Sequence, residues 1–565
     1  MQTTMFSNSK LLKHHVGELP LIHSITRRFR LREILDKFIP QQHNEDIAPA
    51  DTLMLLVSNL SIGRAPLYAL GEWTKSLDLK KIGYGHCNAE KFQDDRFGRA
   101  LDKLFTADRA SLMTAVILEV IQAFQVDLRQ CHNDSTTIKA FGEYSGQSAT
   151  GFELRHGKSK DHRPDLKQLL FTLTVSADGA VPIHHCIYPG NRTDDTTHID
   201  TWKALLELHK TPNFLYVADS KLCTDPQLNI IVEEFDGRVV TVIPNTWSEV
   251  NDFKNELRKS AKKKKEILRV YDEFGNSKHY FSVFEGEYKT KKRGYAIHWI
   301  HSSEKSKEDL IHRKERLKKA EKKLQELLLK INKRNLKSKE AIEDAYQQIL
   351  KHYHVQNFIK VEVKEYAQER STHSSLGRPC KNTHSRLERK TLYELSWEKD
   401  LEALKAEERI DGIFPLLSSD RILSSKEVLI AHKYQPKLEK RFSQLKSVHY
   451  AAPLLCKKLE RVESMMFIFF LALLVQSLVE REVRKKMQTS EWKSLEVYPE
   501  NRDTSHPTTN KIFEAFSQVC SYELVVENSV IESYRDDFNA LQSAVLTLLD
   551  ISPEEYWGDS IVNSN

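Results

Sequence analysis

Apolar residues recur at helical spacing through residues 19–124 of the chain. Ile34, Leu35 and Phe38 form one such group. A repeat of about 3.6 residues is typical of amphipathic helices. We therefore predict an all-α N-terminal domain over residues 1–124.

Four arginines lie near the start of this helical region: Arg27, Arg28, Arg30 and Arg32. Their charges could contact phosphate groups, or they could form an ordinary solvated helix face. The sequence leaves both interpretations open.

Short apolar or alternating runs replace the helical pattern after Gln125. Such runs, bounded by turn residues, predict β-strands. Five of them follow one another: residues 126–132, 169–176, 181–188, 214–218 and 239–243. The pair Asp178-Gly179 predicts a tight turn between the second and third strands. Helical spacing at residues 198–209 and 226–235 separates the later strands. The order strand, hairpin, helix, strand, helix, strand predicts a mixed sheet covered by helices.

The sheet pattern breaks at Lys254. Residues 258–265 are almost wholly basic, and residues 267–284 and 295–301 have the character of further strands. We interpret residues 254–400 as an insertion into the sheet domain.

A heptad repeat of apolar residues follows these strands: Leu310, Leu317, Leu324 and Ile331. A heptad seam is typical of a helix that packs against another helix. Residues 341–353 supply the second helix, so we predict a helical hairpin. Residues 372–390 are rich in Ser, Gly, Arg and Lys and predict a loop.

The sheet domain is predicted to end over residues 401–485. Residues 412–417 have strand character, and a helix follows from Pro436. Residues 465–479 are almost wholly apolar and are flanked by charged residues, which predicts a central buried helix rather than a membrane span. Residues 486–565 are predicted to form a polar linker and a small helical tail.

The composition of the 565 residues is that of a globular protein, with 40% hydrophobic and 29% charged residues. Lys and Arg number 85 and Asp and Glu 79, so the net charge is only +6. Affinity for a polyanion must therefore come from local clusters. Seven scattered cysteines and no Cys-x-x-Cys pair favour a reducing compartment and no structural zinc. We see no secretory signal and expect a soluble cytoplasmic protein.

Two aspartates follow predicted internal strands, where a carboxylate is costly unless it is paired or binds a cation. Asp134 follows the first strand, and Asp219 follows the fourth. If these strands are neighbours, both carboxylates reach one sheet edge, and Glu439 on a predicted helix could join them. Oxygen ligands suit Mg²⁺ or Mn²⁺, and two such ions about 4 Å apart can drive phosphodiester cleavage or strand transfer. Alone, either aspartate could instead cap a helix or a turn.

Five motifs occur in a fixed order along nearly the whole chain. They are Asp134-Ser135-Thr136-Thr137, residues 157–168 (GKSKDHRPDLKQ), residues 188–194 (YPGNRTD), Val217-Ala218-Asp219-Ser220 and residues 435–442 (QPKLEKRF). Together they closely resemble the DDE-type transposases of bacterial insertion sequences.

The resemblance implies an α/β fold. Its core would be a ribonuclease-H-like mixed sheet with helices on both faces, preceded by an all-α N-terminal domain. A β-strand plus helical-hairpin insertion would interrupt this core, leaving residues 125–253 and 401–485 as its two parts. The resemblance also implies that Asp134, Asp219 and Glu439 are the catalytic triad and bind two ions, Mg²⁺ or Mn²⁺.

One departure from the family concerns its last catalytic helix, which carries Tyr, Arg, Glu and Lys in the wider superfamily. Aligned on Glu439, the Lys falls on Lys446, but the Arg falls on Gln435 and the Tyr on His432. Lys446 shares a helix face with Glu439 and would hold a DNA phosphate beside the metal ions. Two residues could make the second phosphate contact: Lys437 and Arg441. These cations could also form a solvated basic face.

Chemistry alone does not assign a role to the polar residues of the second and third motifs, residues 157–168 and 188–194. Arg163 and Lys167 could approach the DNA backbone. Asn191 and Asp194 could simply shape the turn after Gly190.

The function implied by the resemblance is transposition. The enzyme would cleave at the terminal inverted repeats of an insertion sequence and transfer the 3′-OH ends to target DNA. Its partners would be those repeats, the target duplex and a second copy in a synaptic homodimer, with no membrane. The N-terminal domain would bind DNA ends, and the protein would lie at the nucleoid of a bacterial cytoplasm. Two alternatives remain: a two-metal nuclease without strand transfer, and an inactive or domesticated DNA-binding protein derived from a transposase.

Overall fold

The computed structural model describes residues 9–63, 65–158, 163, 165–193, 196–272, 275–373, 385–447, 449, 451, 456–500, 502–526 and 529–559. Contacts between residues divide the chain into two compact units. The first unit comprises residues 1–241 and 430–565, and the second comprises residues 242–429. Asp194 lies outside the described part, as do residues 159–162 and 164 of the second motif, among them His162, and one of the seven cysteines, Cys380.

Helices dominate the first unit from residue 19 to residue 124, as predicted, but the prediction of an all-α domain over residues 1–124 is wrong at its start, where Ser9–His15 form a strand. They are α1 (Leu19–Arg28), α2 (Leu31–Phe38), α3 (Pro49–Ile62), α4 (Leu70–Lys75), α5 (Asp94–Thr106) and α6 (Arg109–Phe124). Helix α3 begins with Pro49, whose fixed φ suits a first helical turn. It ends at Gly63, whose φ of 67° is the left-handed conformation that glycine tolerates best.

A small antiparallel sheet joins the two ends of the described chain. Its strand order is β1 (Ser9–His15), β13 (Cys520–Val526) and β14 (Ser529–Arg535). The prediction of a purely helical tail is therefore wrong, although α16 (Thr509–Phe516), α17 (Ala540–Leu548) and α18 (Pro553–Tyr556) do form. Local sequence cannot reveal this pairing, because β13 meets a strand from the opposite end of the chain.

The large sheet of the first unit has the order β4-β3-β2-β5-β6. Its strands are β2 (Gln130–Lys139), β3 (Gln168–Ser176), β4 (Pro182–Pro189), β5 (Leu215–Val217) and β6 (Arg238–Val242). The first three are antiparallel, whereas β2, β5 and β6 run parallel. The predicted mixed sheet is thus confirmed, as is the turn at Asp178-Gly179.

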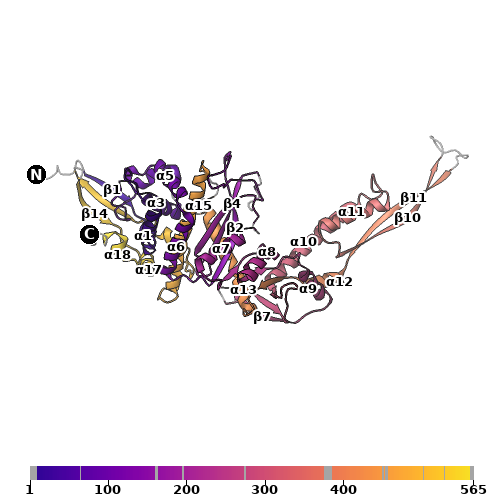
Figure 1. Ribbon diagram of the computed structural model, residues 1–565. Helices are drawn as coiled ribbons and strands as arrows, with labels where there is room; N and C mark the ends of the chain where they lie inside the picture. The colour runs from indigo at the N-terminus through magenta and orange to yellow at the C-terminus, as the bar shows by residue number, and fades with distance from the viewer. Residues whose placement is uncertain are drawn as a thin grey trace. The chain divides into compact units, whose positions relative to one another are not determined.

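Helices cover both faces of this sheet (Figure 1). On one face, α7 (His198–His209) places His198 beside Asn133 of β2 and Tyr216 of β5. On the other face, α14 (Gln435–Ser447) packs against β2 and α15 (Leu459–Met487) against β4. A short helix α8 (Asp225–Leu228) and a π-helical turn (Asn229–Glu234) connect β5 to β6.

Helix α15 is the central helix of the first unit. It is long and apolar enough to cross a membrane by length and composition, yet its apolar window is wholly buried inside the fold. It packs against α3 and α5 as well as β4. This is the environment predicted for residues 465–479, and it is typical of a core helix.

The second unit has its own strands and helices. They are α9 (Ser248–Lys259), β7 (Lys264–Tyr271), β8 (Ser277–Phe284), β9 (Ala296–Ser302), α10 (Ser303–Leu328), α11 (Lys339–His352), β10 (Ile359–His373), β11 (Ser385–Lys399), α12 (Leu401–Glu408) and β12 (Ile413–Ser418). A further helix, α13 (Ser425–Lys433), spans the boundary between the units. The predicted helical hairpin is confirmed in α10 and α11, which pack together.

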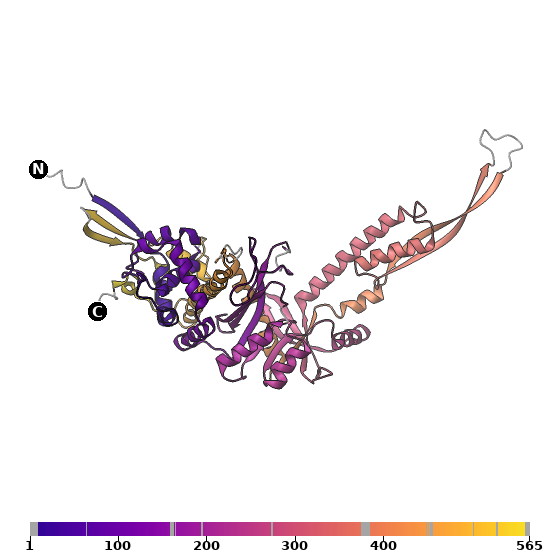
Figure 2. The same ribbon diagram turned by 45° about the horizontal axis from the view of Figure 1, so that its top comes forward.

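The loop predicted at residues 372–390 is wrong where the chain is described. Strands β10 and β11 form a long antiparallel ribbon with paired residues from Ile359–Lys399 to His373–Ser385. Figure 2 shows α10 and α11 lying along part of this ribbon. Leu317, Leu324 and Ile359 share one apolar cluster, so the heptad seam packs partly on the ribbon.

Candidate functional site

Of the two predicted catalytic aspartates, Asp134 lies within β2, and Asp219 follows the end of β5, the parallel neighbour of β2. Strand β2 pairs with β5 in the register Gln130–Leu215, Cys131–Tyr216 and His132–Val217. Asp134 lies two residues beyond His132, and Asp219 lies two residues beyond Val217. If the register is continued by two residues, the two aspartates stand opposite each other, and adjacent strands are about 4.8 Å apart.

The strand containing Asp134 is longer than the sequence pattern predicted. Asp134 lies inside β2 and pairs with Leu173 of β3, whereas the predicted strand ended at residue 132. The error has a physical cause. Residues 133 and 135–137 are polar but buried, so the strand does not show the apolar pattern used to find it.

Alternation along β2 decides which face Asp134 occupies. His132 stacks against Tyr434, which immediately precedes α14, with ring centroids 4.7 Å apart. Asn133 meets His198 of α7 on the opposite face. Because strand side chains alternate, Asp134 belongs to the α14 face, and Asp219 belongs to the same face by its register with Asp134.

Local hydrogen bonds orient both carboxylates. The Ser135 backbone N–H donates to Oδ1 of Asp134 at 2.7 Å, and the Lys221 backbone N–H donates to Oδ1 of Asp219 at 3.0 Å. The Thr241 hydroxyl also donates to the Asp219 carbonyl oxygen at 2.6 Å, which ties this turn to the end of β6. Both aspartate side chains remain partly exposed.

Helix α14 brings Glu439 to the same face. Its first residue, Gln435, donates a side-chain hydrogen bond to the Asn133 carbonyl oxygen at 3.3 Å. Glu439 lies four residues further along α14, so it projects from the same side of the helix as Gln435. Glu439 is exposed. The third acidic residue is therefore one helical turn from a direct contact with the strand that carries Asp134.

The three carboxylates have the right chemistry for a divalent cation but are not gathered around one point. Among the described residues, the three carboxylates do not all come within 4.8 Å of one another. Their oxygen-only donor set fits Mg²⁺ or Mn²⁺. Asp134 lies in strand β2 and Asp219 follows strand β5 of the same sheet, whereas Glu439 lies on helix α14.

Two histidines that the sequence analysis did not assign lie close to this face. Burial lowers the pKa of His132 to about 4. Burial, reinforced by the nearby Lys433 charge, also lowers the pKa of His432 to about 4. Both rings are therefore neutral at neutral pH and add no positive charge beside the carboxylates.

The predicted DNA-contacting residues of α14 divide between two sides of the helix. Lys446 lies seven residues after Glu439 and shares its side. Lys437 is exposed on the other side. Arg441 is 4% exposed, and its guanidinium donates to the carbonyl oxygens of Ala180 at 3.0 Å and Gly179 at 2.8 Å. Arg441 thus fastens α14 to the turn between β3 and β4.

The two basic residues proposed in the second motif lie before β3. Arg163 forms an ion pair with Asp165 at 2.7 Å, and both side chains are about half exposed. The Lys167 ammonium donates to the Tyr144 carbonyl oxygen. Neither residue meets the aspartates through a contact that the structure describes.

A second group of metal-type ligands lies in the N-terminal helices. Asp51, His86 and Cys87 are the one such group, within the described residues, whose ligand atoms all lie within 4.8 Å. The Arg32 guanidinium already donates hydrogen bonds to both carboxylate oxygens of Asp51, at 2.6 and 3.3 Å. Burial and the Asp51 charge raise the pKa of the Cys87 thiol to about 12, so it stays protonated. We interpret this group as an ion-pair cluster that joins α2 to α3.

Comparison with known proteins adds limited information. Residues 11–118 match a family described as a domain of unknown function, DUF4277. This match covers most of β1 and helices α1 to α5, and all but the end of α6. No curated protein matches the sequence. One solved structure, titled "Cryo-EM structure of piggyBac transposase synaptic complex with hairpin DNA", has 9% identity and a TM-score of 0.37. The match covers 98% of this chain and 87% of that one. A likeness of this strength determines neither fold nor function.

Proposed function

We propose that this protein is a DDE-type DNA transposase. It would cleave DNA at the terminal inverted repeats of an insertion sequence and transfer the 3′-OH ends to target DNA. The observation that carries this proposal is the parallel register of β2 and β5, which ends at the pair His132–Val217, two residues before Asp134 and Asp219. Helix α14 contacts β2 beside Asp134 and carries Glu439 on the same side of the sheet.

The arrangement of the strands also supports the proposal. Three antiparallel strands, β4-β3-β2, continue into two parallel strands, β5 and β6, with helices on both faces. This order is compatible with a ribonuclease-H-like core. The second unit, residues 242–429, is inserted between β6 and α14, and therefore before the third acidic residue.

Asp134, Asp219 and Glu439 would hold the divalent ions. When bound, Mg²⁺ or Mn²⁺ supplies an activated oxygen nucleophile and stabilises the leaving oxygen. The chain contributes the orientation of its ligands: the N–H groups of Ser135 and Lys221 each fix one aspartate oxygen. Lys446, on the side of Glu439, would hold a phosphate of the substrate strand.

The decisive experiment uses a labelled duplex that carries the repeats flanking the gene of this protein. Asp219→Asn should lower cleavage in Mg²⁺ or Mn²⁺ by at least about a hundredfold, because it removes a negatively charged oxygen ligand. Asp236→Asn is the matched control. Asp236 is exposed in the same unit and has a φ of 54°, which Asn also tolerates.

The products separate the alternatives. Cleavage at the repeat boundary together with joined products supports a transposase. Cleavage without joining indicates a two-metal nuclease. Binding of the repeats without cleavage in either metal indicates an inactive or domesticated DNA-binding protein. A fully active Asp219→Asn variant with an unchanged melting temperature would remove Asp219 from the site.

A further inference from the structure

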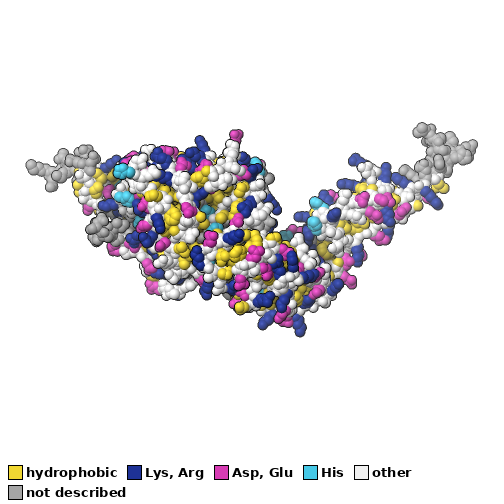
Figure 3. Space-filling view, viewed as in Figure 1, with side chains coloured by type: hydrophobic (Ala, Val, Ile, Leu, Met, Phe, Trp, Pro, Cys, Tyr) yellow, Lys and Arg dark blue, Asp and Glu magenta, His cyan; other side chains and the backbone are white. Residues whose placement is uncertain are grey.

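A basic groove lies beside α14, and Glu439 is not among the residues that line it. Its volume is about 1380 Å³. Four elements line it: α14, the last turns of α15, the β3–β4 turn, and residues 493–510. The surface in Figure 3 shows positive and negative side chains interspersed. Against that background, a groove whose charges are mostly of one sign is a distinct feature.

The charge of the groove is strongly positive. Seven basic side chains line it: Lys437, Lys440, Arg441, Arg481, Arg484, Lys485 and Lys493. Only two carboxylates line it, Asp178 and Glu480. A concave surface of one sign concentrates field and attracts ions of the opposite sign.

The arginines and the lysines of this groove have different surroundings. Arg441 and Arg484 both pair with Glu480, at 3.4 and 2.7 Å. Lys437, Lys440 and Lys485 have no ion-pair partner among the residues that the structure describes. The two carboxylates of the groove therefore pair with its arginines, and the three lysines are not neutralised by them.

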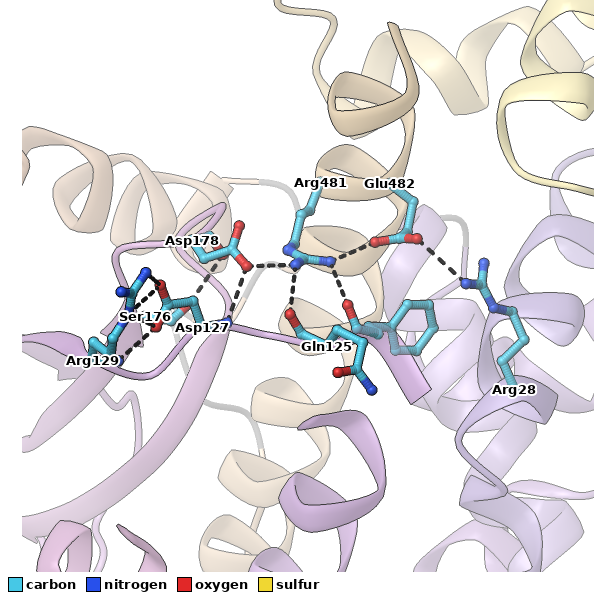
Figure 4. Close-up of polar contacts among 9 residues, drawn as sticks. Arg28, Gln125, Asp127, Arg129, Ser176, Asp178, Arg481 and Glu482 are labelled. Carbon is cyan, nitrogen blue, oxygen red and sulfur yellow. Dashed lines mark hydrogen bonds and ion pairs between the residues drawn. The ribbon is translucent and has the colours of Figure 1, made fainter. Parts of the chain in front are cut away.

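One buried arginine holds the floor of the groove together, as Figure 4 shows. The Arg481 guanidinium contacts Asp178 of the β3–β4 turn and Glu482 of α15. It also donates to the carbonyl oxygens of Phe124 and Gln125 at 3.1 and 3.3 Å, which ties in the end of α6. Glu482 in turn pairs with Arg28 at 3.3 Å. A network of this kind keeps the floor rigid.

The outer wall is also fixed to α15. The Arg484 guanidinium donates to the carbonyl oxygens of Pro507 and His506 at 3.0 and 3.4 Å. The Thr509 hydroxyl donates to the Gln476 carbonyl oxygen at 2.6 Å. The segment 493–510 is thus held in place, and it adds hydroxyl and amide groups of Ser505, Thr508 and Asn510 to the lining.

The groove is separate from the carboxylates and close to them. Gln435 of α14 meets β2 at Asn133, and Arg441 meets the β3–β4 turn at Gly179. The two residues are six positions apart, which is about 9 Å along the helix. Glu439 and Lys446 project from one side of α14 and do not line the groove, whereas Lys437 and Lys440 do.

We propose that this groove is a second DNA site, which binds the phosphodiester backbone of a segment that the carboxylates do not cut. Unpartnered lysines on a rigid concave wall suit contacts to successive phosphates, which position DNA without reading its sequence. This inference rests on the proposed function, because it takes DNA as the substrate of the neighbouring site. A free polyphosphate has the same charge chemistry and is the outcome against which the proposal is tested.

The test measures binding in EDTA, so that it does not depend on cleavage. Full-length protein is titrated into a short fluorescein-labelled duplex of arbitrary sequence, at salt concentrations from about 50 to 200 mM. The variant Lys437→Gln/Lys440→Gln removes two groove charges. The control, Lys203→Gln/Lys210→Gln, removes two exposed charges of α7 and the residue after it, on the opposite sheet face.

We expect the groove variant to bind roughly tenfold more weakly, with a salt slope smaller by about 1.4–1.8, since each lost phosphate contact removes about 0.7–0.9. The control should match the wild type. A groove variant that binds like the wild type overturns the proposal. Inorganic tripolyphosphate that displaces the duplex at equal phosphate concentration also overturns it, in favour of a polyphosphate site.

Cleavage assays keep the two proposals distinguishable. If wild-type protein cuts DNA in Mg²⁺ while the groove variant binds normally, only the groove proposal fails. If wild-type protein neither binds nor cuts DNA, the proposed function fails and takes the groove proposal with it.

Discussion

Individual buried charges decide how the first unit is held together. The Arg481 side chain is 3% exposed and contacts groups from three separate elements. Burial of a guanidinium destabilises the fold unless acceptors pair with it. Removal of one partner therefore lowers the free energy of unfolding, because it leaves part of the buried charge uncompensated. Asp178 is the partner of Arg481 in the β3–β4 turn, so it connects the sheet to α15.

Asp178→Asn should destabilise the first unit in a pH-dependent way. Burial alone would raise the pKa of Asp178, but hydrogen bonds from Arg481 and from the Asp127 N–H outweigh it, so the pKa lies below its usual value. A lowered pKa means that the charge stabilises the fold above the unfolded value near 4. This contribution is lost as the pH falls through the folded pKa.

Urea unfolding of wild type and Asp178→Asn across a pH series tests this expectation. The difference in the free energy of unfolding should be about 1–3 kcal/mol at about pH 7 and should shrink below about pH 4. The exposed Asp236→Asn serves as control and should differ little at any pH. A difference that stays constant with pH would mean that packing, and not charge, makes Asp178 important.

At the level of elements, sequence patterns predicted the parts whose neighbours lie close in the chain. The strands on either side of the Asp178-Gly179 turn and helix α7 follow the predicted ranges within a residue or two. Strands β1 and β13 pair across almost the whole chain, so local sequence cannot reveal their pairing. Residues 372–390, the part of the β10–β11 ribbon predicted as a loop, contain few apolar residues to mark a strand.

Asp134, Asp219 and Glu439 stand out in the sequence by motif and by order, and their role as a catalytic triad stays a prediction. The structure pairs β2, which contains Asp134, with β5, which ends two residues before Asp219. The groove beside them could not be predicted, because its wall combines α14 with residues 493–510. That segment has the composition of a linker, and its position depends on contacts with Arg484 and Gln476.

The β3–β4 turn offers a direct test of its packing on α15. Gly179 has a φ of 79°, and a Cβ there would lie 2.8 Å from Cγ of Arg481. Gly146 has a φ of 81°, and a Cβ there would meet nothing within 4 Å. Alanine at either site bears the same backbone strain, so the comparison isolates the contact with Arg481.

Gly179→Ala should therefore cost about 1–3 kcal/mol more than Gly146→Ala in urea unfolding. Arg481 cannot move aside without losing its bonds to Asp178 and to the end of α6. Equal destabilisation by the two variants would show that Arg481 rearranges freely and that the turn is not held as the structure shows.

At the level of the whole molecule, the division into two units predicts that a substitution that destabilises one unit does not destabilise the other. The second unit has its own apolar clusters around α10 and β10. It also has its own buried ion pair, Arg313 with Asp411, at 2.7 and 2.6 Å with side chains 4% and 7% exposed. This pair joins α10 to the residues just before β12.

Arg313→Ala should destabilise the second unit by about 3–5 kcal/mol, because it leaves the Asp411 carboxylate buried without a partner. Lys323→Ala is the control on the same helix; it removes a largely exposed pair with Glu326 and should change stability by less than about 1 kcal/mol.

Hydrogen exchange reports each unit separately. Amides of α10, β9 and β12 should exchange faster in Arg313→Ala, while those of α3 and α15 keep their wild-type rates. Equal acceleration in α3 and α15 would mean that the two units unfold together. A second unit that loosens alone would instead leave the carboxylates of β2, β5 and α14 in place, so DNA binding in EDTA should survive this substitution.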